Sequence, residues 1–369
     1  MTSPRPVDIG AIERELAELW SEPLGSVAAG AEGMEPATRA CMSNLLIWCA
    51  TQEQARGLPI EIGEIVEKHP SRVLLLVGEP EYENAGLSAS VSAVCHPASA
   101  GRQICSEHVT LSAPTPSTNR LPSIARPLLI GDLPTALWWA APEPPTAAGA
   151  LFDDLAGMAD HVIYDSAGWL DPVRGVVSVA SWEMGLETRR VVSDLAWRRG
   201  KPWRRLVSQT LDPLILPEAL ESIEEVEIEH GPHALPQAWF LIGWLAGRLG
   251  WQPIGGKVAP GVEVSWGFES AKGPLRVTVR RLPSGEPELS RVAIRWNAKS
   301  SKGAATFAWE GRDRLVVLAG SSFASARVLS VHRESRASLV ARQMAKLFHD
   351  PLFRDTLALS RRMAEALLR

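Results

Sequence analysis

Two short apolar runs, with one helical pattern between them, constrain the fold of this chain most strongly. The first run, 135–140, includes the adjacent Trp138 and Trp139, a helical pattern covers 147–159, and the second run is 161–165. A strand, a helix and a second strand in this order form a β-α-β unit with parallel strands. Because neighbouring residues on a strand point to opposite faces, Trp138 and Trp139 are expected to pack into different layers.

The loops after these two strands are the first candidates for a functional site. Loop 141–146 follows the first strand and loop 166–172 follows the second. In a parallel pair both loops lie at the carboxyl end of the sheet, where open α/β sheets bind ligands. The residues expected to share this rim are Trp139, Glu143, Ser166, Trp169 and Asp171.

The pattern on either side of this unit predicts that the unit belongs to an α/β domain and that a second, different domain follows. Alternating short strands follow a buried helix at 235–251, and the acidic run 221–230 indicates an exposed strand or a connector. The first domain is expected to hold helices over 35–56, 60–68 and 118–132, a strand at 72–78 and a hairpin of 88–96 with 103–113. Helices are also expected throughout 173–220, and the last two over 336–348 and 353–368.

The predicted fold class is therefore α/β, or α+β overall. An N-terminal mixed sheet with the β-α-β unit and flanking helices is followed by an antiparallel-sheet domain closed by C-terminal helices. The predicted divisions are an N-terminal arm (1–34), an α/β domain (35–172), a helical connector with the acidic run (173–234) and a domain of antiparallel sheet plus helices (235–369).

The charge of the chain is unevenly distributed. The 369 residues carry a net charge of −4. Residues 271–369 hold 19 Lys and Arg against 8 Asp and Glu, so the preceding part has a net charge of −15. This asymmetry is typical either of an oriented electrostatic contact or of ordinary solvated surface, and both interpretations remain open.

Arginines on two predicted strands of the second domain form a basic face. Residues 275–280 and 291–296 alternate apolar side chains with Arg276, Arg280, Arg291 and Arg295. Arginine forks suit carboxylates and phosphates, so this face is a secondary binding candidate. The alternative is a sheet face that simply contacts water.

Motifs for nucleotide binding and hydrolysis are missing from the sequence. It contains no G-x-G-x-x-G, no Walker loop, no G-x-S-x-G elbow and no H-E-x-x-H. No metal site is expected from Cys95, His96, Cys105 and His108. On the predicted strands the side chain of Cys95 points away from that of His96, and Cys105 points away from His108, so the four cannot surround one ion. Cys95 and Cys105 can face each other across the hairpin, but buried free thiols are favoured.

The N-terminus has no apolar signal core, and the four cysteines include no C-x-x-C pair. The longest apolar run is interrupted by Arg248, so no membrane span is expected. These features favour a cytoplasmic protein.

The segment 189–205 combines seven Lys or Arg with Trp197 and Trp203. This composition occurs in nucleic-acid sites, but packing anchors on a helix with a solvated basic face are favoured here. No nucleic-acid partner is predicted.

Three blocks in one order carry a family resemblance. They are GDLPTALWWA, DHVIYDSAGWLDP and VSDLAWRRGKPWRRLVSQTLDP, which begin at residues 131, 160 and 192. Together they resemble the glucose-6-phosphate dehydrogenase assembly protein family, OpcA. The resemblance is convincing over about residues 70–215.

The resemblance implies a non-enzymatic protein that binds glucose-6-phosphate dehydrogenase, promotes its active oligomer and raises its activity in the oxidative pentose phosphate pathway. It implies no cofactor. Redox control through cysteines near the C-terminus, described for some members, is not expected, because the last cysteine is Cys105.

Aromatic side chains with a neighbouring arginine are the predicted partner contacts, because Trp and Arg dominate interface hot spots. They are Trp139, Trp169, Trp197, Trp203 and Arg204, and core packing is the alternative for each. The alternative function is an enzyme or sensor that binds a sugar phosphate or a nucleotide at the carboxyl end of the first sheet.

Overall fold

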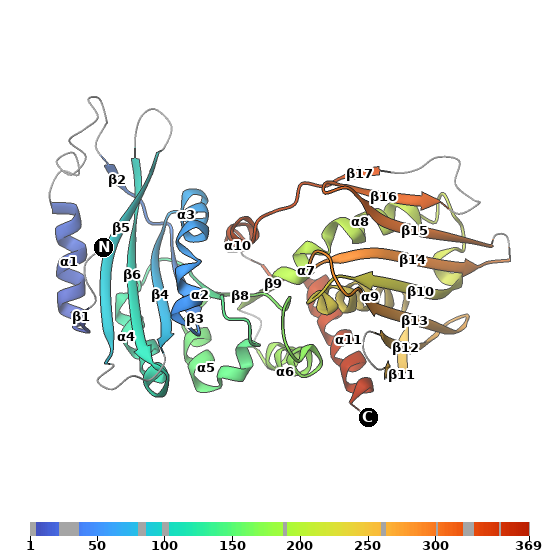
Figure 1. Ribbon diagram of the computed structural model, residues 1–369, viewed down its shortest axis with the longest axis horizontal. Helices are drawn as coiled ribbons and strands as arrows, with labels where there is room; N and C mark the ends of the chain where they lie inside the picture. The colour runs from blue at the N-terminus through green and yellow to red at the C-terminus, as the bar shows by residue number, and fades with distance from the viewer. Residues whose placement is uncertain are drawn as a thin grey trace.

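A computed structural model of the chain describes residues 5–21, 37–79, 86–97, 103–186, 190–259, 263–299, 302–319, 328–346 and 348–368. Two β-sheets form two lobes, and helices lie between them (Figure 1). The first sheet uses strands before residue 195 and the second uses strands after residue 222. The predicted α/β class is confirmed. Among the helices described, none is long and apolar enough to cross a membrane.

The first sheet follows the doubly wound order. Its strands are β1 (Arg5–Pro6), β2 (Ala37–Arg39), β3 (Ser43–Cys49), β4 (Ser71–Glu79), β5 (Ser88–Pro97), β6 (Gln103–Pro114), β7 (Thr135–Trp139), β8 (His161–Tyr164) and β9 (Val191–Asp194). The spatial order is β1-β5-β6-β4-β3-β7-β8-β9, and β2 pairs with β6. The stretch from β6 to β9 is parallel throughout, including the predicted pair β7 and β8. Numbered along the chain, these parallel strands have the order 3-2-1-4-5-6 of dinucleotide-binding folds.

Helices cover both faces of the first sheet. One face packs against α2 (Gln52–Arg56), α3 (Pro59–Lys68) and α10 (Arg336–Met344), and the other against α1 (Ile9–Ser21), α4 (Leu121–Ala125), α5 (Ala150–Gly157) and α6 (Pro172–Met184). Trp138 belongs to the first of these cores and Trp139 to the second, where its ring meets Phe152 at 5.4 Å. The prediction that the two tryptophans occupy different layers is confirmed.

The second sheet is antiparallel except at one pair. Its strands are β10 (Ile223–His230), β11 (Gln252–Ala259), β12 (Glu263–Ser270), β13 (Gly273–Arg281), β14 (Leu289–Asn297), β15 (Lys302–Glu310), β16 (Arg314–Ala319) and β17 (Val328–Ser330). The order is β11-β12-β13-β10-β14-β15-β16-β17, and β10 runs parallel to β13. The sheet is therefore mixed. Strand β10 comes first along the chain but lies between β13 and β14, and it is parallel to β13 and antiparallel to β14.

The remaining helices join the two lobes. They are α7 (Leu195–Arg199), α8 (Lys201–Thr210), α9 (Leu235–Leu249) and α11 (Pro351–Leu367). Helix α9 is apolar on nearly every side and is buried, as predicted. Its Trp239 meets Trp266 of β12 at 5.5 Å, and one continuous apolar core extends from Trp139 to this contact. The two lobes therefore share a core.

Two predicted helices are wrong. Residues 35–56 contain β2, β3 and only the short α2, because β3 is buried on both faces and its apolar run cannot be told from a buried helix. The predicted helix 118–132 ends by residue 128 and is split into one α-turn and short 3₁₀ segments, which accords with its internal prolines Pro122 and Pro127.

The segment predicted as a helical connector contributes a strand to each sheet. Strand β9 completes the first sheet, and the acidic run forms β10 at the centre of the second. Its apolar residues Val226 and Ile228 point inward while the glutamates alternate outward. The run was expected to be an exposed strand or a connector; it is a strand, but a central, half-buried one, because neighbours distant in sequence decide which strand is central. Of the predicted arm 1–34, only 5–21 belongs to the described residues, and there α1 docks on the first sheet through Ile12 and Leu16.

Candidate functional site at the edge of the first sheet

The loops that follow β7 and β8 meet at the carboxyl edge of the first sheet, as the parallel pair predicts. They line one cavity of about 550 Å³. Glu143 and Asp171 lie on its wall, beside Leu170, which is 95% exposed. Asp171 accepts a hydrogen bond from the backbone N–H of Arg174 at 3.0 Å and so caps α6. The remaining predicted rim residues, Trp139, Ser166 and Trp169, are buried.

The strand order reverses between β3 and β7, and the ends of these strands pack closely against their neighbours. The rings of Trp48 and Trp139 lie 5.8 Å apart at the ends of these strands. The carbonyl oxygen of Ala50 approaches β4 so closely that a Cβ on Gly78 would lie 2.6 Å from it. The Ala50 N–H donates to the Gln54 side chain at 2.9 Å.

This arrangement differs from a dinucleotide cradle. In such folds the loop after the first strand offers glycines and backbone N–H groups to a pyrophosphate at a helix N-terminus. Here the corresponding loop leads into a helix of five residues, capped by the Thr51 side chain. The described residues at the switch point therefore do not form a phosphate cradle.

The side chains predicted as partner contacts lie in the interior. The exposed fractions are 3% for Trp139, 5% for Trp169 and 1% for both Trp197 and Trp203. Trp169 stacks on Tyr164 at 5.8 Å, and Trp203 meets Trp309 edge-on at 5.9 Å. These positions correspond to the core-packing alternative, and the four rings help to shape the fold.

Arg204 also serves packing. Its guanidinium lies 3.3 Å from the centre of the Trp197 ring and donates to the Trp197 carbonyl at 2.9 Å. Burial lowers the pKa of Arg204 to about 9. The arginine predicted for a partner therefore covers a tryptophan of its own chain.

Polar contacts around α7 hold the lobes together. The guanidinium of Arg199 donates two hydrogen bonds of 2.7 Å each to the carboxylate of Asp165. Trp197 Nε1 donates to Asp350 at 3.0 Å, and Arg198 Nη1 donates to the same carboxylate at 3.1 Å. Asp350 also caps α11, so one carboxylate joins the loop before that helix to α7.

Two buried carboxyl groups lie near Tyr164 behind this junction. Glu183 on α6 is 4% exposed and Asp194 at the end of β9 is fully buried. Burial raises the pKa of each to about 7, and the charge of Asp194 raises that of Glu183 further. Burial, with these two carboxylates, also raises the pKa of Tyr164. Among the described residues, Glu183 Oε2 and Tyr164 Oη have no hydrogen-bond partner.

Replacing Glu183 with glutamine is expected to flatten the pH dependence of stability. The folded chain keeps this proton up to about pH 7, whereas an unfolded glutamate releases it near pH 4.5. The folded state then binds more protons between these values, so stability falls as pH rises through this window. At pH 8 the variant should be about 3 kcal/mol more stable, and at pH 4 about equal. Urea unfolding across pH 4–8 measures this, and equal slopes would contradict the assignment.

The arginine face of the second sheet is present, and glutamates that the sequence did not place lie within it. Arg280 pairs with Glu263 of β12 at 3.3 Å, and Arg291 pairs with Glu229 of β10 at 3.8 Å. Arg295 pairs with Glu225, also of β10, and Arg276 is exposed beside them. The face is therefore an array of both charges, and the prediction of a basic face is corrected on this point.

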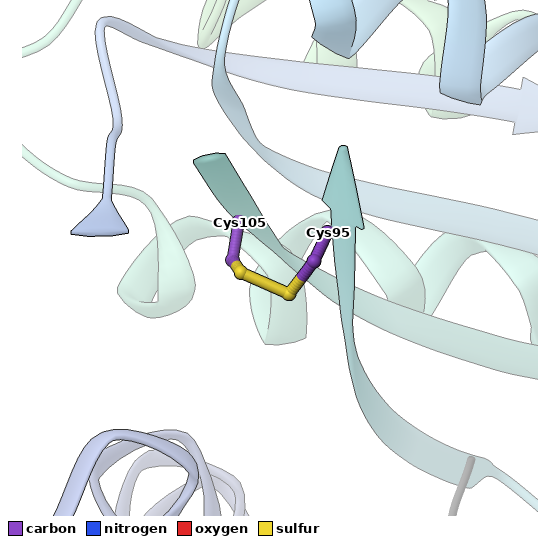
Figure 2. The surroundings of a disulfide bond; sticks show 2 residues. All are labelled: Cys95 and Cys105. Carbon is purple, nitrogen blue, oxygen red and sulfur yellow. A yellow bond between two sulfur atoms is a disulfide. The ribbon is translucent and has the colours of Figure 1, made fainter. Parts of the chain in front are cut away.

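Cys95 and Cys105 form a disulfide across the β5–β6 hairpin (Figure 2). They are direct cross-strand partners with Cα atoms 4.0 Å apart. The prediction of two free thiols was wrong, while Cys41 and Cys49 are free. No group of metal-binding side chains was found within the described ranges.

A thiol reductant is expected to lower the free energy of unfolding by about 2 kcal/mol. The disulfide closes a loop with a sequence separation of 10, and opening it restores entropy to the unfolded chain. The Cys95→Ser/Cys105→Ser variant should not respond to dithiothreitol, whereas the matched control Cys41→Ser should respond like the parent. Four reactive thiols in denaturant without reductant would refute the bond.

Comparison with known proteins identifies the same family across both lobes. Two family models of a "Glucose-6-phosphate dehydrogenase subunit" match, its N-terminal domain over residues 63–181 and its C-terminal domain over 190–357. The OxPP cycle protein OpcA of Nostoc punctiforme is 34% identical over 203 residues, which are 54% of this chain and 42% of that protein. The OpcA protein of Synechococcus elongatus is 26% identical over 84% of this chain and 71% of its own length. The match thus spans less than half of the Nostoc relative.

A solved structure shares the fold alone. The transcriptional regulator Gal80p of Kluyveromyces lactis aligns with a TM-score of 0.50 at 10% identity, over 90% of this chain and 93% of its own. The two domain matches and their order along the sequence show that this chain belongs to the OpcA family of glucose-6-phosphate dehydrogenase assembly proteins.

Proposed function

We propose that this chain is a non-enzymatic assembly factor of the oxidative pentose phosphate pathway. It binds glucose-6-phosphate dehydrogenase in the cytoplasm, promotes the active oligomer and raises activity. The observation that carries this proposal is that the two domain families of the dehydrogenase assembly protein match in order along the chain, at 63–181 and 190–357. The loop after β3 leads into a five-residue helix capped by the Thr51 side chain, unlike a dinucleotide cradle, and this supports a role without a nucleotide cofactor.

Activation of this kind requires a preference for one state of the dehydrogenase. A binder shifts an equilibrium only by the difference between its affinities for the two states. The chain therefore holds the active oligomer more tightly than the inactive form. Nucleic acid and membranes have no part in this mechanism.

Steady-state kinetics of the host's dehydrogenase test the proposal. Increasing amounts of the chain should raise the rate at limiting glucose 6-phosphate, and the effect should saturate. The chain alone should turn over neither glucose 6-phosphate nor NADP. Absence of any rate change, or turnover by the chain alone, would contradict the proposal.

The second candidate is an enzyme or sensor for a sugar phosphate or a nucleotide, and the cavity of about 550 Å³ at the carboxyl edge favours it. A ligand that binds the native state raises the melting temperature. Glucose 6-phosphate, 6-phosphogluconate and NADP should leave the melting temperature unchanged if the assembly factor is correct. A specific rise with one of them supports the second candidate.

A further inference from the structure

One face of the second sheet packs against no helix among the described residues. Its inner face packs against α9 through contacts such as Trp239 with Trp266. On the opposite side, called here the outer face, the described part of the chain places no helix (Figure 1). Residues of β13, β10, β14 and β15 alternate between buried inner and more exposed outer positions.

Backbone pairing arranges the outer face in three rows across these four strands. In the order β13, β10, β14, β15, the first row is Arg280, Glu229, Arg291 and Ala308, the second is Thr278, Glu227, Ala293 and Thr306, and the third is Arg276, Glu225, Arg295 and Ala304. The first and third rows have the same composition and order. Each therefore runs from a long cation, through an anion and a second cation, to a small apolar side chain.

The arginines of these rows reach solvent, whereas the glutamates between them are partly covered and the Oε2 atom of Glu225 is buried. Exposed fractions are 39% for Arg291 and 59% for Arg295, against 28% for Glu229 and 19% for Glu225. Each arginine of these pairs still has donors that face solvent, because a guanidinium carries five N–H groups and one carboxylate cannot take them all. A second carboxylate can therefore be added to each arginine without breaking the existing pair.

We propose that the outer face is the contact surface between two copies of this chain, related by a twofold axis that runs parallel to the strands between β10 and β14. Rotation about this axis leaves each row at the same height along the strands and reverses the order of its residues across the sheet. Glu229 then faces Arg291 of the second copy, and Glu225 faces Arg295 of the second copy. The anionic strand of each copy lies over a cationic strand of the other.

Side-chain size fits the same axis. Strand β13 then lies over β15 of the second copy, so the long Arg280 and Arg276 are placed above Ala308 and Ala304. Sheets that pack face to face keep their strand directions within about 30°, so opposed rows stay close near the axis. An isologous contact needs a self-complementary surface of this kind.

The other simple axis does not fit. A twofold axis along the second row places β10 over its own copy, with Glu225 facing Glu229. It likewise sets Arg276 against Arg280. Like charges in contact oppose association, so the charge pattern selects the axis parallel to the strands.

Sedimentation velocity of charge-reversed variants tests this proposal. The parent chain should sediment as a dimer, a species of twice the 40.0 kDa mass of one chain. Glu225→Arg/Glu229→Arg makes the central strands cationic, and Arg291→Glu/Arg295→Glu makes them anionic; each variant alone should be monomeric. An equimolar mixture should form a heterodimer, because each strand again meets its opposite charge.

Matched controls separate association from folding. Glu53→Arg/Glu67→Arg makes the same charge change at exposed positions of α2 and α3, and it should leave the dimer intact. Circular dichroism and thermal melting check that the variants fold. Ala308→Arg should loosen the dimer by facing Arg280, whereas Ala308→Glu should not, which locates the axis.

Three results would overturn the proposal. The first is a parent chain that stays monomeric up to about 100 µM, a concentration at which even a weak dimer forms. The second is that both charge-reversed variants form dimers on their own. The third is that their equimolar mixture stays monomeric. A monomeric parent whose binding to glucose-6-phosphate dehydrogenase is lost in the same variants would assign the face to the dehydrogenase instead. The proposal does not rest on the proposed function, since the dimer is measured without the enzyme.

Discussion

Replacing Trp197 with alanine is expected to lower the free energy of unfolding by about 4 kcal/mol, the range for a buried tryptophan that leaves a cavity. Its ring is 1% exposed and lies 5.8 Å from that of Phe353 and 6.4 Å from that of Phe240. Arg204 covers the ring, and the indole N–H is bound to Asp350. The substitution thus removes the centre of the contact between α7, α9 and α11.

Urea unfolding followed by circular dichroism and by tryptophan fluorescence measures this loss. Trp197→Phe is the matched variant, because it keeps an aromatic ring in the cavity and should lose roughly half as much stability. A loss below about 1 kcal/mol for alanine, as for an exposed residue, would contradict this packing.

Replacing Asp350 with alanine is expected to cost about 3 kcal/mol. The change leaves Arg198, whose side chain is 12% exposed, without its ion-pair partner. Breaking a buried ion pair from one side costs more than the pair contributes, because a charge stays uncompensated. The α11 N-terminus also loses the cap that accepts from Leu352 and Phe353, worth about 1 kcal/mol.

The pH dependence identifies the charge of Asp350 as the cause. Burial opposes ionisation, but the bond from Trp197 and the charge of Arg198 outweigh it and lower the pKa of Asp350. A carboxyl group with a lowered pKa contributes stability that is present above its unfolded value and lost as pH falls through its folded value. The difference between the parent and Asp350→Ala should therefore narrow in acid. Asp350→Asn, which keeps the cap, should lose less at pH 7, and a difference independent of pH would contradict this account.

Local patterns predicted the strands and helices whose ends are marked by turn residues. The β-α-β unit and the opposite placement of Trp138 and Trp139 follow from strand alternation, and α9 from its apolar length. Strand β3 was predicted as a helix because its residues are buried on every side. Strand β10 was not placed in its sheet because the pairing of Glu229 with Arg291 depends on chain segments far apart.

The candidate site was predictable in outline only. The parallel pair placed Glu143 and Asp171 on one rim, which the cavity confirms. The rim tryptophans were predicted as contacts, whereas apolar rings at strand ends are more stable inside. Asp350 lies 153 residues from Trp197, and only its position before Pro351, typical of a helix start, hinted at a role. Nothing in the local sequence indicates that Glu183 and Asp194 approach each other.

Sedimentation of the host's glucose-6-phosphate dehydrogenase with and without this chain tests the central claim most directly. The proposed function predicts a complex that contains both proteins and an increased fraction of the active dehydrogenase oligomer, with activity following that fraction. Independent sedimentation of the two proteins at every ratio, with an unchanged oligomer distribution, would contradict it.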